Sequence, residues 1–147
     1  MKKNQWLISV LVVLTLLMAA MPAKAAPSQP FYLEKVCDLP NSCLLQNGAP
    51  PFDILNGGRI YYFDHAYFGN PGGNMHESAA VLLTSADGQN TMLGSVSWVM
   101  HDGEFRGHYI IQSGTGIFLG IHARGIVEVI SWDTSTFLLT GDYFFAP

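Results

Sequence analysis

The residue best placed by type and setting to do chemistry is Asp64. It ends the run Ile60–Asp64, IYYFD, in which aromatic side chains precede its carboxyl group. Burial among such side chains would raise the pKa of the carboxyl group and let it act as a catalytic acid. The plainer alternative is an aspartate at a strand end that accepts a hydrogen bond from a loop amide. The residues alone leave both open.

Histidines are frequent enough to raise the question of a metal site. The chain contains five, at His65, His76, His101, His108 and His122. No two have a close ligand spacing such as H-x-H, so packing or surface roles are expected. His76-Glu77 begins like the zinc-protease motif H-E-x-x-H, but Ala80 stands where the second histidine would be. We therefore expect no metal and no cofactor, and keep only His122, in a glycine-rich segment, as a candidate catalytic residue.

Arginine offers one further candidate. The sequence contains neither a G-x-S-x-G nucleophile motif nor a phosphate-binding loop. Arg106 and Arg124 could simply pair with Glu104 and Glu128. Alternatively, Arg124 could bind the carboxylate of a ligand through two parallel hydrogen bonds.

The first 25 residues have the pattern of an export signal. Lys2-Lys3 precedes the apolar run Trp6–Ala20, and Ala23-Lys24-Ala25 has the small-x-small pattern that signal peptidase recognises. We expect cleavage after Ala25, which makes the protein secreted or periplasmic. A retained membrane anchor is the alternative, but the apolar run is shorter than the roughly 20 residues of a bilayer span.

Two cysteines, Cys37 and Cys43, fit an oxidising compartment. The turn-forming residues Asp38, Pro40 and Asn41 lie between them, so a disulfide closing a short loop is the simplest expectation. A redox pair or metal ligands are the alternatives. Neither fits well, because the spacing is not C-x-x-C and no further cysteine could complete a zinc site.

The charge balance excludes some partners. After cleavage, four Lys and Arg remain against eleven Asp and Glu, a net charge of 4 minus 11, or −7. Phosphate contacts need concentrated positive charge, so a nucleic-acid partner is not expected, and attraction to anionic membranes is disfavoured.

The pattern from Arg59 onward is that of β-strands separated by turn residues. Counting one strand before a long loop at Cys37–Gly58, we expect eight: Phe31–Val36, Arg59–Ala66, Glu77–Ser85, Thr91–His101, Phe105–Gln112, Ile117–Ile121, Arg124–Trp132 and Thr136–Phe145. Strong turn signals separate them, at Asn70–Asn74 and Asp102-Gly103 for example. Many short strands with close turns favour a barrel or a sandwich, and closure would remove the exposed edges of so apolar a sheet.

The expected organisation is therefore a single all-β domain, an eight-stranded antiparallel β-barrel. Residues 1–25 form the signal, residues 26–58 the first strand and the disulfide-pinned loop, and residues 59–147 the rest of the barrel. The aromatic C-terminus Tyr143–Phe145 also suggests an outer-membrane barrel. Several expected strands, however, are shorter than the roughly ten residues of a spanning strand.

Two segments carry a family resemblance. Gly114–Gly120, GTGIFLG, matches the G-[ST]-G-x-F-x-G part of a motif in the allene oxide cyclase and dirigent barrels, although Ile121 stands where Ala is usual. Ala123-Arg124-Gly125 is similar to the dirigent A-R-G, with a two-residue insertion. Gly58–Asp64 resembles the first barrel strand, which ends in Phe-Asp in dirigents. The resemblance covers roughly residues 57–145 and departs at His76–Ser78.

The resemblance implies a calycin-like barrel that holds a small hydrophobic molecule and could guide its cyclisation or stereoselective coupling without a cofactor. It also allows a homo-oligomer. Since the interior of a small barrel is its pocket, we expect the pocket to be lined by Tyr61, Phe63, Glu77, Trp98, Tyr109 and Arg124. The rival hypothesis is a non-enzymatic secreted interaction protein, such as an inhibitor, an immunity protein or a surface-associated factor. A barrel interior filled by side chains would favour this hypothesis.

Overall fold

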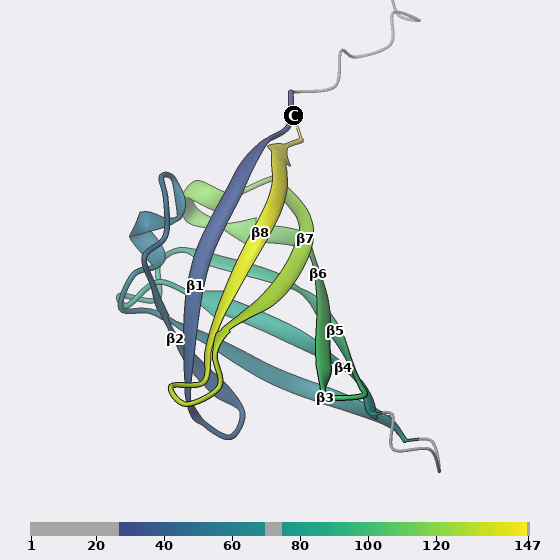
Figure 1. Ribbon diagram of the computed structural model, residues 1–147. Coiled ribbons are helices and arrows are strands. Elements are labelled where there is room, and N and C mark those ends of the chain that lie inside the picture. Colours follow the sequence, from purple (N-terminus) through teal and green to yellow (C-terminus); the bar gives the residue numbers. More distant parts are fainter. Residues whose placement is uncertain (1–26, 70–74, 147) are drawn as a thin grey trace, which may run out of the picture.

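The computed structural model describes residues 27–69 and 75–146, and these form a closed antiparallel β-barrel (Figure 1). Each strand pairs with the next, and the last pairs with the first. The strands are β1 (Gln29–Leu39), β2 (Ser42–Gln46), β3 (Arg59–Gly69), β4 (Met75–Thr84), β5 (Thr91–His101), β6 (Glu104–Thr115), β7 (Ile121–Ser131) and β8 (Thr136–Phe145). The fold class expected from the sequence is confirmed. The expected signal segment and the turn at residues 70–74 lie outside the described residues.

Alternation along the strands separates the inside of the barrel from the outside. In β6, Tyr109 and Ile111 are buried while Arg106, His108 and Ile110 are exposed. Successive side chains of a strand point to opposite faces, so this period of two places the apolar set inside. Strands other than β2 are 10 to 12 residues long, longer than several expected. Their outward faces mix charges such as Arg106 and Glu128 with apolar side chains such as Ile110 and Ile126, whereas a lipid-facing barrel carries an uninterrupted apolar band there.

Two expected elements differ from the structure. The segment expected to be one loop, Cys37–Gly58, contains β2 and a 3-10 helix, η1 (Phe52–Leu55). Conversely, the strand expected at Ile117–Ile121 is replaced by the end of a second 3-10 helix, η2 (Gly116–Phe118), and a turn, and Ile121 begins β7. β2 could not be recognised in the sequence, because a strand of five residues between turn-forming residues is too short to show a clear hydrophobic period. In η2, Gly116 has a φ of 63°, which breaks extended structure.

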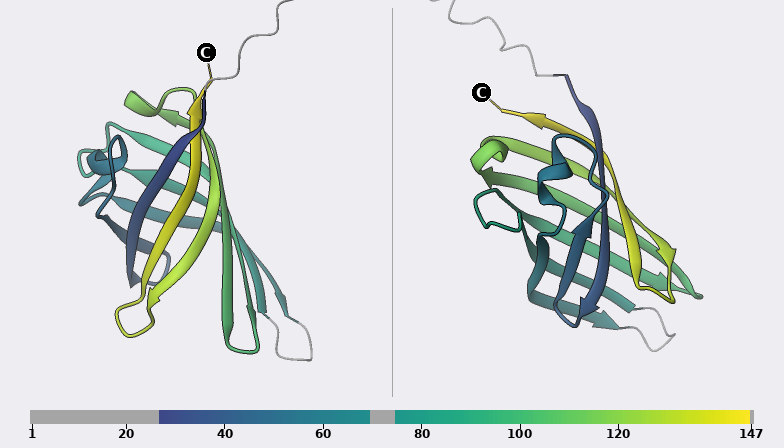
Figure 2. Two further views of the ribbon diagram at one scale, coloured as in Figure 1. Left: turned by 45° about the horizontal axis from the view of Figure 1, so that its top comes forward. Right: turned by 90° about the vertical axis from the view of Figure 1, so that its left-hand side faces the viewer.

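An aromatic cluster fills one end of the barrel. Phe52 of η1 lies inside it, with its ring centroid 4.2 Å from that of Phe31, 4.9 Å from Tyr143 and 5.7 Å from Phe118. Phe31 in turn contacts Tyr109, at 5.1 Å between ring centroids. Figure 2 shows η1 and η2 at the same end as the C-terminus, whereas the β1–β2, β5–β6 and β7–β8 turns lie at the opposite, hairpin end.

The Cys37–Cys43 disulfide joins β1 to β2, with an S–S distance of 2.08 Å, as the sequence predicts. It lies beside the two-residue turn at the tip of this hairpin, near the hairpin end of the barrel. No helix among the described residues is long and apolar enough to cross a membrane.

β7 and β8 approach so closely that one pair of facing positions admits only glycine. Gly125 faces Gly141 in the ladder, and a Cβ atom added at Gly125 would lie 1.9 Å from the carbonyl oxygen of Thr140. A backbone atom cannot move aside as a flexible side chain can. The glycine-rich segment noted in the sequence therefore serves close strand approach here.

We predict that Gly125→Ala lowers the free energy of unfolding by about 1–3 kcal/mol or more, as overpacking does. The matched control is Gly69→Ala, because a Cβ at Gly69 meets nothing within 4 Å. That variant should stay within about 0.5 kcal/mol of the parent. Urea unfolding followed by circular dichroism measures both, and equal stability of the two variants would contradict the close approach.

Candidate functional site

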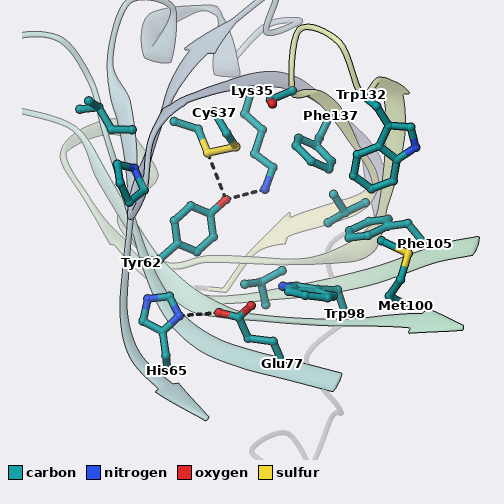
Figure 3. Close-up of a pocket in the computed structure, with 16 residues that line it drawn as sticks. Lys35, Cys37, Tyr62, His65, Glu77, Trp98, Met100, Phe105, Trp132 and Phe137 are labelled. Carbon is teal, nitrogen blue, oxygen red and sulfur yellow. Dashed lines mark hydrogen bonds and ion pairs between the residues drawn. A yellow bond between two sulfur atoms is a disulfide. The ribbon is translucent and has the colours of Figure 1, made fainter. Parts of the chain in front are cut away.

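The hairpin end of the barrel is hollow, in contrast to the filled end. A cavity of about 270 Å³ lies between β1, β3, β4, β5 and the β7–β8 turn. Aromatic side chains form much of its wall: Trp98, Phe105, Trp132 and Phe137 (Figure 3). Four polar side chains enter it: Lys35, Tyr62, His65 and Glu77. A few polar groups in an aromatic cavity are typical of a small-molecule site.

Lys35 is the most unusual of these residues, because its side chain is only 7% exposed. It follows Phe31 and Leu33 on the inward face of β1. Its Nζ donates a hydrogen bond of 2.5 Å to the hydroxyl oxygen of Tyr62. The same nitrogen lies 4.9 Å from the ring centroid of Tyr62 and 4.8 Å from that of Phe137, within cation–π range. Within residues 27–69 and 75–146, no carboxylate forms an ion pair with it.

Burial perturbs both members of this pair. Loss of hydration disfavours the ammonium form and lowers the pKa of Lys35 from 10.5 to about 8. Burial, and next the negative charge of Glu77, raise the pKa of the Tyr62 hydroxyl above its ordinary value. Tyr62 therefore stays protonated at neutral pH. Lys35, with a pKa of about 8, loses its proton only slightly above neutral pH.

A second polar pair lies on β3 and β4, nearer the tip of their hairpin. Nδ1 of His65 is 2.5 Å from Oε1 of Glu77, and the two side chains are 22% and 12% exposed. The ring of His65 also stacks on that of Tyr67, with 5.7 Å between centroids. Nε2 of His65 is buried and has no hydrogen-bond partner among the described residues. An imidazole held against a carboxylate is an arrangement suited to proton transfer.

A bulge in β3 decides which side chains reach the cavity. Phe63 pairs with Ala80 and Ala66 with Ser78, so Asp64 and His65 together face a single residue of β4. Asp64 adopts a φ of 54°, the left-handed conformation common at such bulges. The extra residue reverses the alternation after Tyr62. His65 therefore points inward, at a position that regular alternation would have given to Asp64.

The site residues expected from the sequence fall into three places. Glu77 and Trp98 line the cavity. Tyr109 is buried in the aromatic cluster of the filled end, away from the cavity. The others lie on the outer surface of the barrel: Tyr61, Phe63, Asp64, His122 and Arg124. His122 stacks there on Phe144, with 5.2 Å between ring centroids.

Asp64 and the flanking aromatics therefore lie apart from the polar groups of the cavity. Tyr61 and Phe63 face outward by regular alternation, which would have turned Asp64 inward. The bulge turns Asp64 outward as well. Tyr61 is 42% exposed and Phe63 38% exposed. Neither the acid role expected for Asp64 nor a pocket-lining role for these two aromatics has support in this placement.

Sequence reasoning missed Lys35, Tyr62 and His65. A signal for Lys35 was present, because Phe31 and Leu33 are apolar and share its strand face in FYLEK. An inward-facing lysine in that alternation is rare enough to have marked it. His65 had no such signal, since the bulge that turns it inward is not visible in the residue pattern.

Comparison of the chain with models of known protein families gives no match, and comparison with curated proteins gives none either. The function is therefore argued from the cavity and its side chains.

We predict that Lys35→Met stabilises the protein at pH 7, by about 1–3 kcal/mol, because it removes a buried charge that has no carboxylate partner. The folded pKa of Lys35 is lowered, so the parent gains stability as the pH rises from 8 towards 10.5. The advantage of Lys35→Met should shrink over that window. Urea unfolding of both proteins at pH 7, 8, 9 and 10 measures it.

The control is Arg106→Met, which removes an exposed cation and should change stability by less than about 0.5 kcal/mol at every pH. A Lys35→Met protein less stable than its parent at pH 7 would show that the hydrogen bond and the ring contacts outweigh the desolvation of the ammonium.

Proposed function

We propose that this protein is an exported β-barrel that binds a small, mostly apolar molecule in the cavity at its hairpin end. The observation that carries the proposal is the cavity itself, about 270 Å³ in volume, with aromatic walls and a buried lysine whose amine contacts the hydroxyl group of Tyr62. A ligand in this cavity would remove the apolar surface of its walls from water, which favours binding. The volume is at the lower end of known ligand sites, which favours a small ligand.

The polar groups support recognition of one end of that ligand. Lys35 and Tyr62 meet at one side of the cavity, and His65 and Glu77 meet at another (Figure 3). Burial of these four polar side chains costs hydration, which their two mutual contacts offset only in part. Their presence in an apolar cavity therefore points to a role in recognition. An apolar body against Trp98 and Phe137 would leave a polar end of the ligand facing these groups.

The resemblance to allene oxide cyclase and dirigent barrels extends the proposal to catalysis. A barrel that holds one conformation of a flexible substrate can guide ring closure without a cofactor. The His65–Glu77 pair could transfer the proton that such a closure needs. Secretion or residence in the periplasm is part of the proposal, supported by the expected signal at residues 1–25 and by the disulfide.

The rival hypothesis, a secreted interaction protein that binds no small molecule, would draw support from a filled barrel interior. The cavity gives it none. Exposed apolar side chains such as Ile110 and Ile126 do lie on the outer face of the barrel, but they specify no particular partner.

We predict that protein purified from its own culture carries a ligand of a few hundred daltons or binds one from a panel of fatty-acid and phenolic compounds. Native mass spectrometry detects the first, and quenching of tryptophan fluorescence measures the second, since Trp98 and Trp132 line the cavity. Val127→Phe fills the cavity and should weaken binding at least about tenfold. Val127 is 3% exposed and faces inward.

The matched control is Ile126→Phe, one residue away on β7 and facing outward. It should bind as the parent does. A bare mass together with no binding from the whole panel would reject the ligand-binding proposal in favour of the interaction protein.

A further inference from the structure

Binding of an apolar molecule does not by itself require a lysine in the cavity wall. Lys35 is the single lysine of residues 27–146, and it is almost fully buried. Its amine is held between the rings of Tyr62 and Phe137 and is aimed into the cavity (Figure 3). A methionine would fill the same space without the cost of desolvating a charge. The amine is therefore the part of the cavity that calls for a functional explanation.

We propose that the cavity takes an aldehyde with an apolar body, and that the Lys35 amine forms a reversible imine with its carbonyl carbon. This inference rests on the proposed function, because it names the ligand class of the same cavity. The aromatic wall would hold the body of the aldehyde, and the carbonyl group would lie beside Nζ of Lys35 and the hydroxyl group of Tyr62.

The chemistry balances without any oxidant or reductant. The lone pair of neutral Nζ attacks the carbonyl carbon, a C–N bond forms, and the π electrons of the C=O bond move to oxygen. A proton passes from nitrogen to that oxygen, which gives a carbinolamine. The carbinolamine then loses its hydroxyl group and one proton as water, and a C=N bond remains. Hydrolysis by the reverse steps releases the aldehyde.

The surroundings of Lys35 favour the neutral amine that this reaction needs. With a pKa of about 8, about one molecule in ten carries the free amine at pH 7, against about one in 3,000 for an ordinary lysine. The other titratable groups that face the cavity are Tyr62, His65 and Glu77. Glu77 is engaged by His65, so it does not hold Lys35 as an ammonium ion through a direct ion pair.

Tyr62 is in position to move the proton. Its hydroxyl oxygen lies 2.5 Å from Nζ of Lys35 and 3.7 Å from Sγ of Cys43. A disulfide sulfur has no proton, so any hydrogen bond between them is donated by the hydroxyl group. The hydroxyl group thus lies between the disulfide and Nζ, within reach of the carbon and oxygen atoms that a carbinolamine on Nζ would add. The disulfide thus positions Tyr62 as well as joining β1 to β2.

The experiment uses the full chain with cinnamaldehyde and octanal as probes, at pH 7 in the presence of cyanoborohydride, which reduces imines to stable amines. We expect an adduct equal to the mass of the aldehyde less one oxygen atom, located on Lys35 by peptide mass spectrometry. Labelling of Lys35 should exceed that of free N-acetyl-lysine amide in the same solution on the order of 100-fold.

Two variants test the roles of the residues. Lys35→Arg keeps the positive charge but cannot form an imine, and should abolish the adduct. Tyr62→Phe keeps the ring and the amine but removes the proton carrier, and should slow labelling at least about tenfold. Circular dichroism establishes that each variant is folded before it is compared.

Cinnamyl alcohol and cinnamic acid, which cannot form an imine, test binding in the cavity separately from imine formation. If either binds by tryptophan quenching while the aldehydes leave Lys35 unlabelled, the imine is ruled out and the ligand-binding function stands, with the acid as the preferred class if it alone binds. If no adduct forms, and neither these compounds nor the fatty-acid and phenolic panel binds to a protein that also shows a bare native mass, both proposals fail. Labelling of Lys35 no faster than that of free N-acetyl-lysine amide also overturns the imine.

Discussion

The pairing of the first strand with the last is the constraint on which the rest of this structure depends. Residues 29–36 of β1 form an unbroken antiparallel ladder with residues 136–143 of β8. This ladder joins segments about a hundred positions apart and turns an open sheet into a barrel. Closure creates an interior and removes the sheet edges that would otherwise template aggregation.

Closure also makes the two ends of the barrel different. At one end, η1 inserts Phe52 and Leu55, both fully buried, and a cluster of aromatic rings forms around Phe52. At the other end no element of residues 27–69 and 75–146 enters, and this part of the barrel is hollow around Lys35. The filled end concentrates apolar burial, which stabilises the fold. That stability offsets the cost of burying the Lys35 amine and Nε2 of His65, which has no hydrogen-bond partner among the described residues. Binding sites commonly lower stability in this way.

The cavity depends on three local features from separate parts of the chain. The disulfide joins β1 to β2 and touches the hydroxyl group of Tyr62. The bulge at Asp64 turns His65 towards Glu77 on the next strand. The β7–β8 hairpin brings Phe137 over the amine of Lys35, and Trp132 packs edge-on against Phe137. Each feature positions a different side chain around the cavity. The arrangement of the polar groups therefore requires several hairpins of the closed barrel together.

Residue order alone was enough to predict the all-β class, most strand positions, the disulfide and the inward face of regular strands such as β6, because a period of two is a local property of the backbone. It also placed Glu77 and Trp98 among the lining residues. The folded barrel was needed to show that Tyr109 belongs to the filled end, that His65 replaces Asp64 on the inner face, and that Lys35 meets Tyr62. Alternation tells which residues share a face of one strand. It does not tell their level along the barrel axis, the site of a bulge, or which strands meet on closure, since these follow from register between distant segments.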